Sequence, residues 1–187
     1  MKVNVGVSKR HVHLTEDSII KLFGTNELPV RNNLSQPGQF ASTYTVDLKN
    51  NNKIIPHVRV VGPARSYNQI EIDESDSKEL ELNPPTRRSG DLDNSLGITL
   101  IGPKGEITLN SGVIKAKRHV HLDNKTAQKE NLQDNEIVEI FYNDNYILDA
   151  EIKVTEDAYN ELHIDTFEEI RYDLSSGEEV EIKKCGK

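Results

Sequence analysis

The sequence predicts a mainly β protein built from two similar halves. Its apolar residues alternate with polar ones over many short segments, which is the period of a strand with one buried face. Turn-forming residues separate these segments, as in Gln36–Gly38 and Asn143–Asn145. Two strings of residues also recur in the same order along the chain. Many short strands with regular turns are typical of barrels or sandwiches, and the recurrence indicates an internal duplication.

The alternating segments define the expected strands, and three short helices are expected between them. The strands are Val3–Val7, Thr43–Leu48, Val58–Val61, Ile70–Ile72, Ile98–Ile101, Ile107–Leu109, Ile137–Ile140 and Ile147–Ile152. The helices are Glu16–Phe23 between the N-cap Thr15 and the stop Gly24, Lys125–Asn131 after the N-cap Asp123, and Asp76–Leu80. The polar, non-periodic stretch Asn83–Asp91 is expected to be an ordered loop between the halves.

The composition excludes several classes of function. The formal net charge is −8 at pH 7, so a basic footprint for nucleic acid over the whole surface is absent. No apolar run approaches the ~20 residues that a membrane-spanning helix needs. The N-terminus lacks the pattern of a signal peptide, and the single Cys185 allows no internal disulfide. These features predict a reducing, cytoplasmic location.

The longer of the two recurring strings contains a pair of histidines. Lys-Arg-His-Val-His-Leu occurs at Lys9–Leu14 and again at Lys117–Leu122, 108 positions later. Alternate residues of a strand point to the same face, so the two histidines of each copy lie side by side. The pairs are His11 with His13 and His119 with His121. One such pair is more often an ordinary surface pair, but its recurrence in the same context favours a metal site.

The second recurring string supplies a third candidate ligand for each half. Tyr67–Asp73 matches Tyr159–Asp165 at a distance of 92 positions, which aligns Glu71 with His163. The result is one group of two histidines and a glutamate, and one group of three histidines. Three protein ligands with an open fourth position are typical of catalytic zinc sites. Because the distance falls from 108 to 92, the first half carries about sixteen extra residues between the two strings.

Several cations and one turn are candidates for binding an anion. Arg65 has no basic counterpart in the second half, and it is either an oxyanion or phosphate clamp or a turn residue paired to a surface acid. Arg87 and Arg88 form a cationic loop whose guanidinium groups suit phosphate. Gln36 begins a turn whose backbone amides are a further candidate for binding an anion. Arg10 and Arg118 precede the histidine pairs, and for them we expect structural ion pairs.

These residues together resemble one known family, the PduL-type phosphate acyltransferases, or phosphate propanoyltransferases. The matching strings are VGVSKRHVHL, LSQPGQFAS, VRVVGPARSYNQIEI, RRSGDL, GVIKAKRHVHL and ELHIDT, which span residues 5 to 166 in the order of the family. The resemblance implies transfer of an acyl group between coenzyme A and inorganic phosphate. It also implies two pseudo-symmetric β-barrels with short capping helices. The barrels would comprise residues 10–117 and residues 118–187, with strand 1–9 exchanged into the second barrel.

The resemblance also implies the site and the partners. Two zinc ions per chain would orient the phosphate, and Arg65 would stabilise the tetrahedral oxyanion as the catalytic residue. Arg88 becomes a secondary contact for phosphate or CoA, and a homodimer is expected. Members destined for microcompartments carry an N-terminal extension that this sequence does not show, so acetyl-CoA is as suitable a substrate as propanoyl-CoA. A two-metal phosphatase or esterase and a zinc-stabilised binding module are the alternatives. The implied zinc ligands are His11, His13 and Glu71 for one ion, and His119, His121 and His163 for the other.

Overall fold

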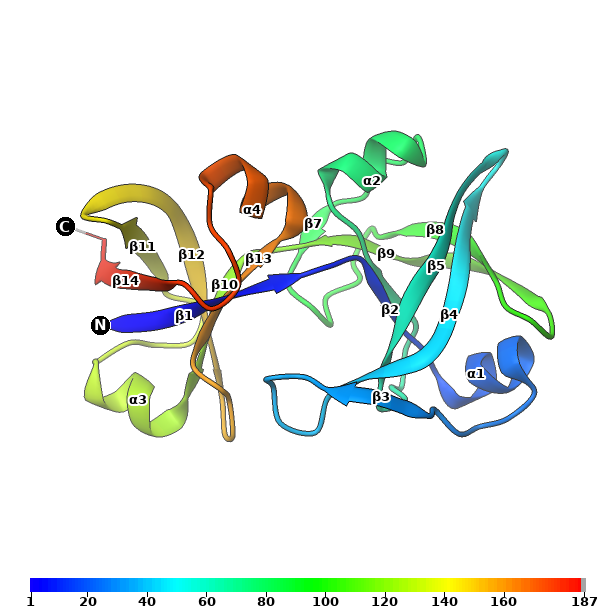
Figure 1. Cartoon of the computed structure of the whole chain (residues 1–187), viewed down its shortest axis with the longest axis horizontal. Coiled ribbons are helices and arrows are strands. Elements are labelled where there is room, and N and C mark those ends of the chain that lie inside the picture. Colours follow the sequence, from blue (N-terminus) through cyan, green and yellow to red (C-terminus); the bar gives the residue numbers. More distant parts are fainter. Residues whose placement is uncertain (186–187) are drawn as a thin grey trace. The chain divides into compact units, whose positions relative to one another are not determined.

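The computed structural model describes residues 1–185, which fold into two units (Figure 1). The continuous unit is Lys9–Ala116. The discontinuous unit combines Met1–Ser8 with the chain from Lys117 onward. Among the described residues, no helix has the length and apolar character needed to cross a membrane.

The continuous unit is built on a closed ring of six strands. The strands of the whole continuous unit, inside and outside this ring, are β2 (His11–His13), β3 (Val30–Asn33), β4 (Phe40–Asn50), β5 (Lys53–Gly62), β6 (Gln69–Glu71), β7 (Thr86–Arg87), β8 (Leu96–Ile101) and β9 (Glu106–Ala116). The hydrogen-bonded order β4–β5–β2–β6–β9 is closed by β8, which pairs with both β4 and β9. The short strands β3 and β7 extend from β4 and β9 outside this ring.

The discontinuous unit is also a closed barrel of six strands. Its strands are β1 (Lys2–Ser8), β10 (His119–Asp123), β11 (Ile137–Tyr142), β12 (Asn145–Thr155), β13 (Glu161–Asp165) and β14 (Glu179–Lys184). The first strand of the chain, blue in Figure 1, lies beside the red β14 and closes the ring by pairing with β13 on its other side. The predicted fold class, mainly β with two barrels and short helices, is confirmed.

The two rings have the same order and sense of strand pairing. In each, the His-x-His strand pairs parallel with one neighbour and antiparallel with the strand of the third candidate ligand. The register also agrees, because Ile70 lies opposite both Val12 and Val113, and Leu162 lies opposite both Val120 and Val5. All six of these apolar side chains are fully buried in the cores. We infer an internal duplication from this shared pattern.

The helices match the sequence prediction unequally. The helix α1 (Glu16–Phe23) has the predicted bounds, with the Thr15 hydroxyl accepting from Ser18 N and with Gly24 in the left-handed conformation at φ 76°. The helices α2 (Glu74–Glu79) and α3 (Asn124–Lys129) form near their predicted positions but with shifted ends. The helix α4 (Thr166–Tyr172) was not predicted, although Asp165 and Glu168 form a capping box at its start. None of its residues is fully buried.

Three other segments differ from the sequence prediction. The strand β3 was missed because all four of its residues are exposed, so no alternation marks it. The strand β14 was also missed, although Val180 and Ile182 alternate with polar residues in it. The stretch Asn83–Asp91 does not join the two units, because its strand β7 pairs with β9 inside the continuous unit.

A repeated asparagine fastens the third-ligand strand to the end of the His-x-His strand in each unit. The side-chain oxygen of Asn68 accepts from the backbone N of Thr15 at 2.9 Å. In the same way Asn160 accepts from the backbone N of Asp123 at 2.8 Å. Asn160 also donates to the Asp123 carboxylate and to the Thr126 hydroxyl, at 2.8 and 3.0 Å. The asparagine of the repeated Tyr-Asn pair therefore supports the strand on which the third candidate ligand lies.

Replacing this asparagine should destabilise the discontinuous unit. In Asn160→Ala the half-buried backbone N–H of Asp123 loses its acceptor, which costs about 1–3 kcal/mol of unfolding free energy. Urea unfolding in the presence of a chelator measures this cost without a contribution from bound metal. Asn32→Ala is the control, since that exposed side chain donates only to a neighbouring carbonyl, and it should stay within about 0.5 kcal/mol of the parent. Equal midpoints for the two variants would contradict the supporting role of Asn160.

Candidate metal centres

Two groups of side chains in the described chain are arranged so that each could hold a metal ion. The His–Glu group consists of His11, His13 and Glu71, and the three-histidine group consists of His119, His121 and His163. Within each group, one possible ligand atom from every residue lies within 4.8 Å of the others. The His–Glu group lies in the continuous unit and the three-histidine group in the discontinuous unit. Both groups contain the residues that the sequence nominated.

The His–Glu group lies on the outward face of its barrel. Val12 is fully buried in the core, so the histidines on either side of it point the other way. The strand β6 runs antiparallel to β2 and places Glu71 directly opposite His11. The Glu71 Oε2 atom lies 3.5 Å from His11 Nε2. Three ligands therefore come from two adjacent strands whose register is fixed by backbone pairing.

The hydrogen bonds of His11 and His13 determine which ring nitrogens face each other. His11 Nδ1 lies 2.8 Å from the carbonyl of Lys9, and His13 Nδ1 lies 3.2 Å from the carbonyl of Val61. A carbonyl only accepts, so these Nδ1 atoms are the donors and carry the protons. In the neutral rings the Nε2 lone pairs then face each other at 3.1 Å. A cation between them satisfies both lone pairs, so this arrangement fits a bound metal ion.

Gln69 holds the carboxylate of the His–Glu group. Its side-chain amide donates to Glu71 Oε1 at 2.6 Å and to the Ser89 hydroxyl at 2.8 Å. Its side-chain oxygen accepts from the backbone N of Gly90 at 2.7 Å. Gln69 is fully buried, so its position is fixed by packing as well as by these bonds. The sequence reasoning missed it, although the second repeat aligns it with Glu161 and so marks both positions.

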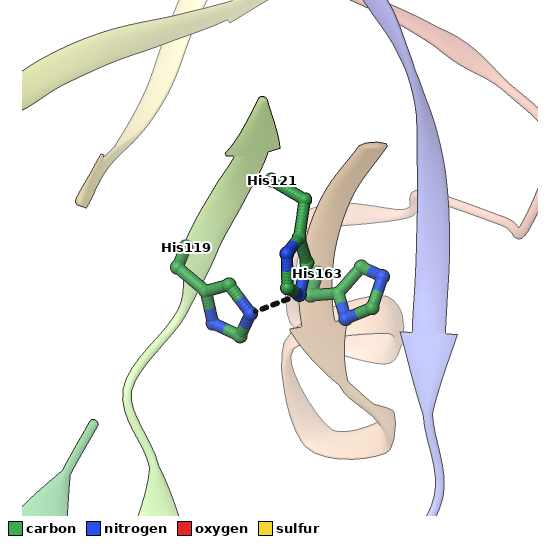
Figure 2. A group of neighbouring side chains, drawn as sticks. All are labelled: His119, His121 and His163. Carbon is green, nitrogen blue, oxygen red and sulfur yellow. Dashed lines mark hydrogen bonds between the residues drawn. The ribbon is translucent and has the colours of Figure 1, made fainter. Parts of the chain in front are cut away.

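The three-histidine group repeats the close approach of two Nε2 atoms, with imidazole as the third ligand (Figure 2). His119 Nε2 lies 3.0 Å from His121 Nε2, which the dashed line marks. His119 Nδ1 lies 2.8 Å from the carbonyl of Lys117, as His11 does from Lys9. The strand β13 places His163 opposite His119, with 5.2 Å between the ring centroids.

Burial keeps His119 in the form that binds a metal. Removal from water is the main cause that lowers its pKa well below the usual range, and the neighbouring His163 and His121 lower the pKa further. A histidine must be neutral to offer a lone pair to a metal ion. The site is therefore arranged to present this imidazole unprotonated, and the nitrogen-rich donor set of both groups suits zinc.

Arg65 is connected to the His–Glu group through hydrogen bonds. Its backbone N donates to the carbonyl of Leu14, beside His13, at 2.9 Å. Its guanidinium donates to the hydroxyl of Tyr67 at 3.3 Å and to that of Ser89 at 3.5 Å. Since Ser89 also accepts from Gln69, a chain of hydrogen bonds leads from Arg65 to the carboxylate of Glu71. This pattern favours a positioned cation over an ordinary turn residue, and Ser89 is a further member that the sequence reasoning missed.

Arg88 and Gln36 lie in two loops of the continuous unit. Arg88 is half-buried and precedes Ser89 in the loop after β7, where its backbone carbonyl accepts from Asp91 N at 2.9 Å. Gln36 is buried in the loop between β3 and β4, where its backbone carbonyl accepts from Gln39 N at 3.2 Å. Their roles as substrate contacts stay predictions.

The arginines that precede the histidine pairs form ion pairs, as expected for a structural role. Arg10 Nη1 lies 2.5 Å from Asp76 Oδ1, and Arg118 Nε lies 3.0 Å from Glu168 Oε1. Both acids occupy the third position of a helix and complete its capping box. Burial raises the pKa of both carboxyl groups, and the paired arginine opposes that rise. The ion pairs therefore connect each His-x-His strand to the helix that follows the third candidate ligand.

Comparison with known proteins identifies the family. The family described as phosphate propanoyltransferase matches residues 4–174. A phosphate propanoyltransferase of Thermotoga maritima is 41% identical over 183 residues, covering 95% of this chain and 87% of its own length. One of Rhodopseudomonas palustris is 38% identical over 187 residues, covering 98% of this chain and 83% of its own. One of Levilactobacillus brevis is 39% identical over 171 residues, covering 89% of this chain and 82% of its own length. The chain therefore belongs to the phosphate propanoyltransferase family of acyltransferases.

Proposed function

We propose that this protein transfers the acyl group of a short-chain acyl-CoA to inorganic phosphate, with propanoyl-CoA and acetyl-CoA as substrates. Membership of the family supports the reaction type. The observation that carries the proposed mechanism is the pair of three-ligand groups, each with two Nε2 atoms about 3 Å apart. Groups with three protein ligands leave a coordination position for a reactant, unlike closed structural zinc sites.

We assign one zinc ion to each group. His11, His13 and Glu71 would hold one ion, and His119, His121 and His163 the other. Zinc bound there would supply a Lewis acid whose charge attracts and orients the anionic phosphate. The protein itself contributes the fixed direction of its ligands, because backbone carbonyls hold His11, His13 and His119 through their Nδ1 atoms.

Arg65 is the proposed catalytic residue. A phosphate oxygen attacks the thioester carbonyl carbon, the new C–O bond forms, and the carbonyl oxygen becomes an oxyanion. The C–S bond then breaks, and coenzyme A leaves as a thiolate. A guanidinium that is always charged, and whose position is fixed by Tyr67 and Ser89, is suited to stabilising the oxyanion.

Direct attack by phosphate needs no acyl-enzyme. The hydroxyl of Ser89 lies beside the guanidinium of Arg65, and it accepts hydrogen bonds from two donors, Gln69 and Arg65. Such an environment lowers the electron density of the oxygen instead of activating it as a nucleophile. We therefore propose that both substrates are bound together when the acyl group moves.

A phosphate-dependent thiol assay tests the reaction. Purified protein is mixed with acetyl-, propanoyl- or butanoyl-CoA, and released CoA is measured with and without inorganic phosphate. We expect thiol release only when phosphate is present, with an equal amount of acyl phosphate trapped as a hydroxamate. Release without phosphate would indicate a thioesterase. Hydrolysis of acyl phosphate without CoA would indicate a two-metal phosphatase, and no turnover would favour a binding module.

Removal of one ligand tests the metal assignment. His119→Ala should reduce bound zinc from about two ions per chain to about one and abolish turnover, because the three-histidine group loses one of its three proposed zinc ligands. Zinc is counted by elemental analysis of the purified protein. His57→Asn is the matched control, since His57 is exposed and has a positive φ of 59° that Asn also adopts. It should keep its zinc and its activity, and unchanged zinc in His119→Ala would refute the assignment.

Removal of the guanidinium tests the role of Arg65. Arg65→Ala should lower turnover by about 10²–10³-fold, the usual effect of losing one oxyanion donor. Bound zinc should stay unchanged, because Arg65 is not a ligand. Arg171→Ala removes an exposed guanidinium from α4 and should leave turnover within about twofold. If Arg65→Ala also keeps turnover within a few-fold, Arg65 is not the oxyanion donor.

A further inference from the structure

Glu161 lies beside the three-histidine group at the position that Gln69 occupies beside the His–Glu group. The two residues are aligned by the second repeat, 92 positions apart. In the strand pairing Gln69 lies opposite His13, and Glu161 lies opposite His121. Each therefore occupies the same place relative to its histidine pair.

Both residues bind the third candidate ligand of their own group, with the chemistry reversed. Gln69 donates through its amide to the carboxylate of Glu71 at 2.6 Å. Glu161 Oε2 accepts from His163 Nε2 at 2.7 Å. In Figure 2 one ring nitrogen of His163 points away from the other two imidazoles. An acidic ligand is thus held by a donor, and an imidazole ligand by an acceptor.

A glycine in the neighbouring strand provides the space for the Glu161 carboxylate. Gly6 on β1 pairs with His163. A Cβ added to Gly6 would lie 2.5 Å from Glu161 Cδ and 2.7 Å from Oε2, both far inside van der Waals contact. In the continuous unit the matching position beside Glu71 is Ile114, which carries a full side chain. Glycine therefore occupies the position that lies against the Glu161 carboxylate, and a larger residue occupies the matching position in the other unit.

We propose that Glu161 is a positioning residue for the metal centre of the three-histidine group, and that Gly6 makes its position possible. The carboxylate fixes the ring of His163 through the nitrogen that does not face the metal and raises the basicity of the other nitrogen. Each metal group then has one buried or half-buried carboxylate, directly as Glu71 or one hydrogen bond away as Glu161. The two centres carry a similar charge although their ligand sets differ. This inference rests on the zinc sites of the proposed function.

Zinc affinity tests the role of Glu161 separately from activity. The background variant is His13→Ala, which disables the His–Glu group and leaves the three-histidine group as the one zinc site. Metal-free protein is titrated with zinc against a chromophoric chelator. Glu161→Gln, nearly the same in shape, should weaken zinc binding by about 10–100-fold, the usual effect of losing an outer-shell partner. Glu156→Gln removes an exposed carboxylate and should leave the affinity within about twofold.

Gly6→Ala changes no polar group and gives an independent test. The three atoms that the added methyl would meet most closely all belong to the end of the Glu161 side chain. Zinc binding should therefore weaken by roughly fivefold or more, while urea unfolding of the metal-free protein changes only slightly. A role in packing alone predicts the opposite, a lower unfolding midpoint with unchanged zinc affinity, and would overturn the proposal.

An exchanged pair gives the most specific test. His163→Glu alone places two carboxylates at positions 161 and 163, where they repel each other. Adding Glu161→Gln recreates the Gln–Glu pair of the continuous unit and should tighten zinc binding about tenfold relative to His163→Glu alone. If the background binds one zinc equally well with and without the Glu161 carboxylate, this inference fails and the proposed function stands. If the parent protein binds no zinc, the proposed zinc sites fail as well.

Discussion

The antiparallel pairing of each His-x-His strand with the strand of the third candidate ligand is the constraint on which both candidate metal groups depend. In β2 and β6 this pairing places His11 opposite Glu71, and in β10 and β13 it places His119 opposite His163. A slip of one residue would turn the ligands into the core and valine to the outside. The register is held because the intervening Val12 and Val120 are fully buried. Packing of the core therefore determines the geometry of the ligands.

Polar contacts outside the core support the same register in both units. An asparagine joins the start of each third-ligand strand to the end of the His-x-His strand. An arginine before the histidines joins that strand to the capping box of α2 or α4. Each of these contacts involves a residue of one of the two recurring strings. This explains why the strings extend beyond the ligands: their other members hold the two strands together.

The sequence was sufficient where a signal is local or repeated. Thr15 and Gly24 defined α1 at both ends because capping depends on neighbouring residues. The six candidate ligands could be proposed because the alignment of two strings needs no knowledge of the fold. In contrast, α4 is only seven residues long and none of them is fully buried, so no buried face marks it in the sequence. Gln69 and Ser89 were missed since their importance lies in hydrogen bonds across 20 residues of sequence, which only the folded chain brings together.

The differences between the two units are concentrated where substrate contacts are expected. Thr45 lies opposite Arg59, and Ile137 lies opposite Glu151 at the equivalent place in the other unit. Thr45 and Ile137 are already 92 positions apart, so the sixteen extra residues of the continuous unit come before Thr45 and include Gln36. Leu100 lies opposite Leu48, and Ile182 lies opposite Ile140, so Leu100 and Ile182 are equivalent positions. They are 82 positions apart in the sequence, whereas equivalent positions earlier in the two halves are 92 apart. The ten extra residues of the continuous unit lie between α2 and β8, in the segment of Arg88 and Ser89. We infer that the shared framework builds the two candidate metal groups, and that residues added to one half adapt it to the proposed substrates, which are asymmetric.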